Sequence, residues 1–141
     1  MSRVTKTSAW LAFCLIIASA LAIFPGAAAA APTLDIRIQS ETGGSPPGEL
    51  VITDPSGVRT GPEATDIHLS NPMSGLYNLR VIGRNTGTYT LFLKAYSESG
   101  STSDVRFPNM TIKSGEVHHY DVNFSAEGPK LDVRRTRITP E

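Results

Sequence analysis

The sequence contains one cysteine and one tryptophan, and both of them, Cys14 and Trp10, lie close to its amino terminus. Beyond residue 31 the chain has no thiol, so this part can form no disulfide, thiolate metal site or cysteine nucleophile. Its stability must come from an apolar core, and about 110 residues are enough to bury one without covalent staples. The same part also lacks the largest aromatic side chain.

Neither sign of charge is in excess, because 13 Lys and Arg residues stand against 13 Asp and Glu residues. Nonspecific binding to nucleic acid depends on an excess of basic side chains, so nucleic acid is not an expected partner. The densest basic cluster is Arg134, Arg135 and Arg137. It could attract an anionic surface, or it could decorate an edge strand and discourage pairing with another chain.

The first 31 residues have the three parts of an export signal. Arg3 and Lys6 form a basic start, residues 9–24 an apolar run, and residues 25–31 an alanine-rich end. An uncleaved membrane anchor is the alternative, but Pro25-Gly26 ends the run before the roughly 20 residues that span a bilayer. We expect cleavage after Ala29, Ala30 or Ala31. The sequence therefore predicts an exported protein, periplasmic, extracellular or at the cell surface, with no membrane span after cleavage.

After the leader, apolar residues recur at every second position, which is the period of a half-buried β-strand. The clearest runs are 34–38, 76–81, 89–96 and 118–124. Glycine and proline clusters at 43–48 and 54–57 predict turns between strands. The pattern predicts an all-β fold, an antiparallel β-sandwich of about seven to eight short strands preceded by a cleavable signal helix.

The predicted organisation has three parts: a signal peptide over 1–31, a β-sandwich domain over 32–126, and a C-terminal edge strand or tail over 127–141. Within the domain, Gly75–Leu79 and Gly87–Leu91 repeat the pattern G-x-Y-x-L twelve residues apart. We interpret this repeat as a β-hairpin whose turn lies at 83–87.

The run LVITDPSGVRTG over 50–61, followed by Asn71-Pro72 and the two G-x-Y-x-L strands, resembles the pre-peptidase C-terminal domain type. That type is an Ig-like sandwich module of exported bacterial proteins, and the resemblance covers about residues 34–125. It implies a non-catalytic accessory domain. We therefore expect noncovalent interaction at the periplasm or cell surface, with a protein or glycan of the cell envelope as partner.

A carbohydrate- or calcium-binding module is the alternative. Asp54 is a candidate Ca²⁺ ligand if Asp66 or Glu63 joins it, and otherwise it caps the tight turn that begins there. Tyr96 is the candidate platform for a sugar, with Phe92 on the same strand face. For both rings, packing against the protein itself is the competing interpretation.

An enzyme is not expected. The nucleophile motif G-x-S-x-G is absent, which makes a hydrolase the least favoured alternative. His118 and His119 are adjacent on a predicted strand, so they point to opposite faces and do not readily chelate one zinc ion. We assign no catalytic residue, no cofactor and no metal.

Overall fold

The computed structural model describes residues 30–141 except Pro129, and it describes no side chain for Glu63. The predicted signal helix and its cleavage site lie outside the described residues. The described part of the chain is all-β. Its nine strands are β1 (Thr33–Ser40), β2 (Gly48–Thr53), β3 (Arg59–Ala64), β4 (Asp66–Ser70), β5 (Gly75–Gly83), β6 (Gly87–Tyr96), β7 (Thr102–Ile112), β8 (Glu116–Ser125) and β9 (Lys130–Pro140).

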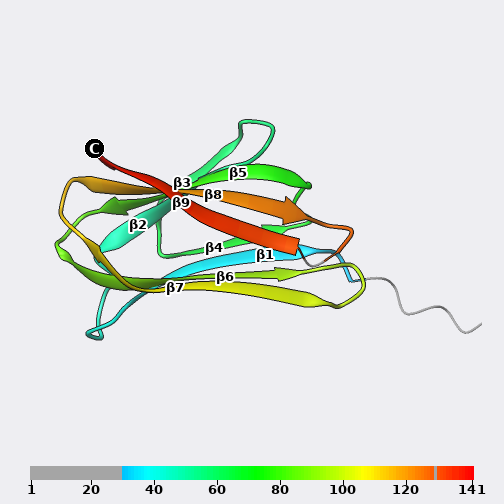
Figure 1. The fold of residues 1–141 in the computed structure, drawn as a ribbon, viewed down its shortest axis with the longest axis horizontal. Coiled ribbons are helices and arrows are strands. Elements are labelled where there is room, and N and C mark those ends of the chain that lie inside the picture. The colour runs from blue at the N-terminus through cyan, green and yellow to red at the C-terminus, as the bar shows by residue number, and fades with distance from the viewer. Residues whose placement is uncertain (1–29, 129) are drawn as a thin grey trace, which may run out of the picture.

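The strands form two antiparallel sheets that lie face to face as a sandwich (Figure 1). The four-stranded sheet has the order β4-β1-β6-β7, and the five-stranded sheet has the order β3-β2-β5-β8-β9. The predicted all-β class and sandwich are therefore confirmed, with nine strands in place of seven to eight. No helix of a length and hydropathy suited to crossing a membrane occurs in residues 30–141 as described.

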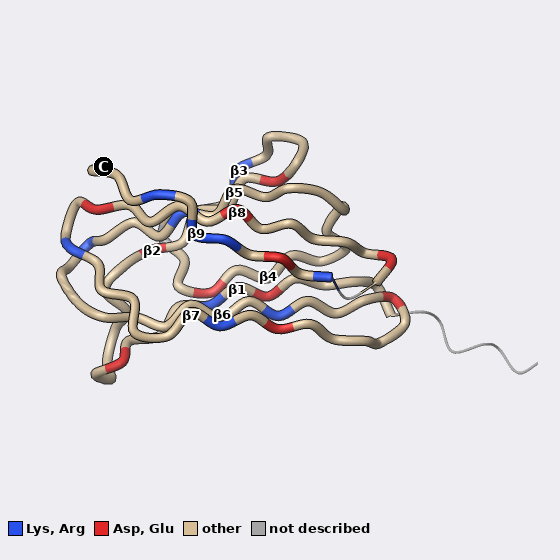
Figure 2. The backbone as a smooth tube through the Cα atoms, viewed as in Figure 1, with Lys and Arg blue, Asp and Glu red and all other residues tan. Residues whose placement is uncertain are grey.

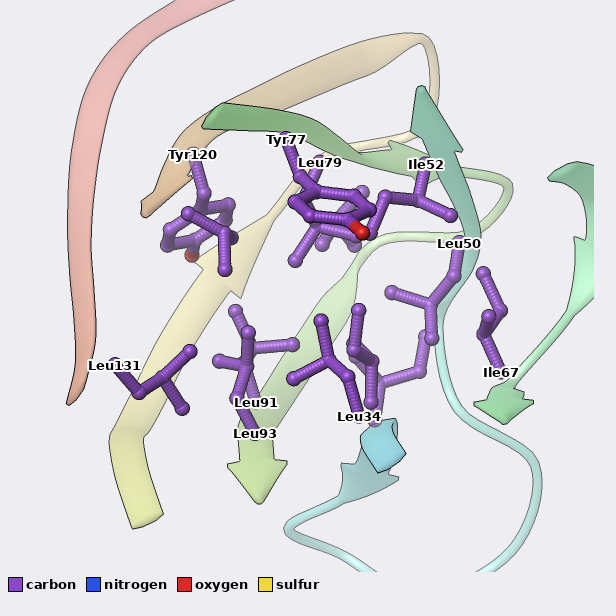
Figure 3. Close-up of a cluster of buried hydrophobic side chains, with 14 of the residues drawn as sticks. Leu34, Leu50, Ile52, Ile67, Tyr77, Leu79, Leu91, Leu93, Tyr120 and Leu131 are labelled. Atoms are coloured by element: carbon purple, nitrogen blue, oxygen red, sulfur yellow. The ribbon is translucent and has the colours of Figure 1, made fainter. Parts of the chain in front are cut away.

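The core lies between the two sheets and is built by the predicted alternation. Apolar side chains at every second position point inward from both layers (Figure 3). The faces expected for the two central strands are confirmed, since all of these side chains are buried: Tyr77, Leu79 and Val81 on β5, and Tyr89, Leu91, Leu93 and Ala95 on β6. Burial of this apolar surface is the main stabilising contribution in a chain that has no disulfide in this region.

The predicted hairpin between the two G-x-Y-x-L segments is wrong, because β5 and β6 belong to different sheets. β5 pairs with β2 and β8, whereas β6 pairs with β1 and β7. The connection crosses between the layers, and the amides of Arg84 and Asn85 both donate to the carbonyl of Pro47 at 2.9 Å. The crossing lets the two apolar faces bury each other, which two strands of one sheet cannot do.

The repeated glycines have a packing role instead. A Cβ atom on Gly75 would lie 2.8 Å from Cγ of Pro55, and one on Gly87 would lie 3.0 Å from Cβ of Pro47. Each glycine therefore makes room for a proline ring, Pro55 from the loop that follows β2 and Pro47 from the loop that precedes it. The two glycines of the repeat therefore each begin a strand at a point where a proline ring packs against the backbone.

Three other segments differ from the prediction or complete it. β3 is not among the predicted runs, because its sequence RTGPEA carries no apolar alternation. β7 continues past Pro108, because the register shifts between the pairs Tyr89–Met110 and Leu91–Phe107 and a bulge takes up the proline. At the C-terminus, β9 is an edge strand that pairs with β8.

Candidate functional site

The outward side chains of the four-stranded sheet form a polar and aromatic surface, which we call the four-strand face. Residues opposite each other in register point to the same side of a sheet. One row across β4, β1, β6 and β7 consists of His68, Asp35, Lys94 and Asp104, and the next consists of Asp66, Arg37, Phe92 and Arg106. Acidic, basic and aromatic side chains therefore meet across the strands. Figure 2 shows acidic and basic positions near one another on this sheet.

The basic side chains of the four-strand face have their contacts within it. Nη2 of Arg37 lies 2.9 Å from Oδ2 of Asp66, and His68 Nδ1 is hydrogen-bonded to Asp35 Oδ1. The other two cations lie against rings: Lys94 Nζ is 5.0 Å from the Tyr96 centroid, and Arg106 Cζ is 5.1 Å from that of Phe92. Each basic side chain thus has an anionic or aromatic partner.

The face is hollowed at its centre. A depression of about 520 Å³ is lined by residues of three strands: Asp35, Arg37 and Gln39 of β1, Asp66 and His68 of β4, and Phe92, Lys94 and Tyr96 of β6. Phe92 and Tyr96 are half-buried there and point away from the core. The depression thus offers two ring surfaces, hydrogen-bond donors and carboxylate acceptors to one ligand.

The two rings of this site can be found from the sequence, but its charged residues cannot, apart from Asp66, which the sequence offers only as a calcium ligand. Phe92 and Tyr96 stand out in a strand pattern, whereas Arg37, Lys94 and Arg106 look like ordinary solvated positions. What the sequence does show is that each of them occupies a polar position between apolar residues of a strand. Only the strand order and register bring them together.

Asp54, the other candidate, is engaged within its own turn. Its Oδ1 accepts hydrogen bonds from the amides of Ser56 at 2.9 Å and Val58 at 2.8 Å, and from the Ser56 hydroxyl at 2.7 Å. The Ser56 hydroxyl contributes most to lowering the pKa of Asp54. This is the turn-capping arrangement that the sequence offered as the alternative to calcium.

The proposed companions of Asp54 are not assembled around it. Asp66 is paired with Arg37 on the other sheet, and the side chain of Glu63 lies outside the described residues. Among the side chains that the structure describes, no three His, Asp or Glu residues are grouped so as to hold a metal ion.

A second polar group lies inside the core. The Tyr89 hydroxyl is 2.8 Å from Nδ1 of His118 and 2.8 Å from the Tyr120 hydroxyl. Nε2 of His118 lies 3.6 Å from the carboxylate of Glu116. Burial is the main cause that lowers the pKa of His118 and raises the pKa of both tyrosines. His118 is fully buried, so this group stabilises the interior and presents no His118 atom to a ligand.

Comparison with known proteins returned no relative. No protein-family model, no curated protein and no solved structure matches the chain. The resemblance to the pre-peptidase C-terminal type therefore stays a prediction.

Proposed function

We propose that this chain is an exported, non-catalytic β-sandwich module that binds a glycan noncovalently on the four-strand face. One observation carries the proposal: Phe92 and Tyr96 lie four residues apart on β6, half-buried in a hollow lined by paired donors and acceptors. Ligand sites generally combine apolar ring surface with a few placed polar groups. The apolar faces of sugar rings stack on such surfaces, and their hydroxyls pair with carboxylates and guanidinium groups.

The present contacts of the rings do not oppose this function. A cation over an aromatic ring at an exposed site contributes only about 0.5–1 kcal/mol, and an exposed ion pair about 0.2–1 kcal/mol. Lys94 and Arg106 can therefore move aside at small cost and donate to ligand hydroxyls.

The charge balance of the face favours a neutral glycan. Three basic side chains, Arg37, Lys94 and Arg106, stand beside three acidic ones, Asp35, Asp66 and Asp104. An acidic polysaccharide would approach a surface with no net attraction for it, whereas a neutral one uses donors and acceptors equally.

The setting of this function follows from the leader and the fold. An export signal, if cleaved, delivers the domain to the periplasm or cell surface, where envelope glycans are available. The sandwich is compatible with an accessory module of the pre-peptidase C-terminal type, and such modules act by binding.

A protein partner is the second candidate, and a different surface favours it. Val58 and Met73 are 62% and 48% exposed at the rim of a hollow of about 220 Å³, which Leu69 and Tyr77 also line. Exposed apolar side chains beside the edge strands β3 and β4 are typical of protein contacts.

Thermal unfolding of the exported protein against a panel of neutral and acidic polysaccharides tests the proposal. A ligand at about a hundred times its dissociation constant stabilises the fold by about 2.7 kcal/mol. We expect a neutral polysaccharide to raise the midpoint, and Tyr96→Ala to remove the shift. Leu76→Ala, an exposed change on the other sheet, serves as control.

No shift with any polysaccharide would reject the glycan. A protein partner whose binding depends on Val58 and Met73 would then establish the second candidate. Addition of Ca²⁺ or EDTA in the same experiment tests the Asp54 alternative.

A further inference from the structure

The outer surface of the five-stranded sheet carries a different arrangement of charge. Arg80 on β5 is opposite His119 on β8, and His119 is opposite Arg137 on β9. Residues in register point to the same side, so these three side chains lie next to one another away from the core. We call them the basic row.

The basic row borders a hollow of about 450 Å³. Thr53 and Asn78 also line it and can donate hydrogen bonds, and Thr136 and the acidic Asp121 complete its wall. Neighbouring strands lie about 4.8 Å apart, so β5 and β9 are separated by about 10 Å across β8. Two extended arginine side chains can reach one small ligand from opposite sides of such a gap.

The two arginines of the row differ from Arg84 and Arg134 in lacking a described carboxylate partner. Arg84 bonds Glu49 at 2.8 Å and Glu141 at 3.0 Å, and Arg134 bonds Asp132 at 3.3 Å. Among the side chains that the structure describes, neither Arg80 nor Arg137 has a carboxylate within 4.0 Å. Their guanidinium groups are therefore not committed to an internal ion pair with those side chains.

A bulge selects which arginine of the C-terminal cluster joins the row. The register shifts between His119 and Tyr120, and the Thr136 hydroxyl donates to the His119 carbonyl at 3.3 Å. Arg135 consequently lies opposite the buried Tyr120, on the inner side, while Arg137 lies opposite His119 on the outer side. The run of arginines in the sequence is thus divided between two sides of the sheet.

His119 is held between the arginines by its own contacts. Its Nε2 is 2.8 Å from Oγ1 of Thr139. Burial lowers the pKa of His119, the positive charges of Arg137 and Arg80 lower it further, and Asp121 opposes them. The imidazole is therefore less readily protonated than usual while the site is empty.

We propose that the basic row is a second binding site, and that it takes the phosphate group of an anionic ligand. Planar guanidinium groups match phosphate oxygens in bidentate geometry, and charge-assisted hydrogen bonds of this kind are about twice as strong as neutral ones. Arg80 and Arg137 supply the charge from two sides, and the hydroxyl and amide side chains supply neutral donors. A bound phosphate also favours the protonated imidazole, so affinity rises as the pH falls.

Titration calorimetry of the exported full chain with inorganic phosphate tests the site. We expect Arg80→Gln and Arg137→Gln each to weaken binding by at least about tenfold, the effect of one lost charged hydrogen bond. Arg106→Gln makes the same charge change on the four-strand face and leaves the affinity unchanged. Thermal midpoints of all three variants establish that they are folded.

The pH dependence and the source of the phosphate are tested in parallel. We expect protonation of His119 to make phosphate bind more tightly at pH 5.5 than at pH 7.5. His119→Gln should reverse this dependence, because phosphate itself carries more negative charge at pH 7.5. Cosedimentation with phosphatidylcholine vesicles, with and without phosphatidylglycerol, distinguishes a lipid headgroup from a soluble phosphate. Binding in either arm that Arg80→Gln abolishes and Arg106→Gln preserves supports the site and identifies its source. Absence of binding in both arms, or equal loss in all three arginine variants, overturns the proposal.

Discussion

The two outer faces of the sandwich use the same residue types in opposite ways. On the four-strand face, Arg37 is bound to Asp66, and Lys94 and Arg106 lie over rings. On the five-stranded sheet, Arg80 and Arg137 flank His119 with no described carboxylate within 4.0 Å. A surface whose charges are matched internally favours a neutral polar ligand, whereas unmatched guanidinium groups favour an anion. Contact with a carboxylate or a ring, and not the number of charges, distinguishes the cations of the four-strand face from the two arginines of the basic row.

The largest expected effect comes from truncating buried leucines, which tests whether one continuous core stabilises both sheets. Leu93 lies on β6 beneath the four-strand face, and Leu79 lies on β5 beneath the other. Truncation of either to alanine should cost about 2–5 kcal/mol of unfolding free energy, because a buried leucine leaves a cavity. Denaturant unfolding measures both. If one change had no effect, the two sheets would not share a continuous core.

The buried tyrosines give the next largest effect. Tyr89→Phe leaves Nδ1 of His118 and the Tyr120 hydroxyl without their shared partner. Unsatisfied buried polar groups cost about 1–3 kcal/mol, and denaturant unfolding should show a loss of that size. Tyr96→Phe, which removes a hydroxyl from a half-buried ring on the surface, is the matched control and should be nearly neutral.

Acid should destabilise the protein through His118, which belongs to the buried tyrosine cluster. The folded state lowers the pKa of His118, mainly by burial and also through Arg135, although Glu116 opposes this. The unfolded chain then binds more protons, so the unfolding free energy falls as the pH decreases below the ordinary histidine pKa of about 6.5. His118→Leu should reduce this slope, with His119 accounting for what remains. An unchanged slope would show that His118 does not titrate on unfolding.

A smaller effect is expected when an arginine of the four-strand face loses its carboxylate partner. Asp66→Asn removes the partner of Arg37 and should cost at most about 1 kcal/mol, because the pair is exposed. The four-strand face then carries an unmatched arginine. The measurement uses Asp66→Asn combined with Arg80→Gln, so that the basic row does not bind. We expect this double variant to bind inorganic phosphate weakly in calorimetry, and Arg80→Gln alone not to bind it. No gain would show that pairing does not govern ligand choice.

The sequence predicts the layers better than it predicts their connections. Period-two alternation correctly gives the buried faces of β5 and β6, because it depends only on which side of a strand is apolar. It cannot say whether two such strands pair within one sheet or face each other across the core. The repeat around Tyr77 and Tyr89 therefore predicts a hairpin that the structure does not contain. Short polar strands such as β3 carry no alternation at all and become strands through pairing with β2.

The candidate sites show the same division. Tyr96 and Phe92 could be found from the sequence, because rings on the polar phase of a strand are unusual. The basic row could not, since Arg80 and Arg137 are far apart in the chain and meet only through the β5-β8-β9 register. The bulge at Thr136 adds a shift that no local pattern indicates.

The central claim, that the four-strand face is the glycan site, is tested most directly by thermal unfolding with neutral polysaccharides. The account predicts that one of them raises the midpoint of the wild-type protein and of Arg80→Gln, and that Tyr96→Ala abolishes the shift without unfolding the protein. A shift that persists in Tyr96→Ala and in Phe92→Ala, or no shift at all, would contradict it.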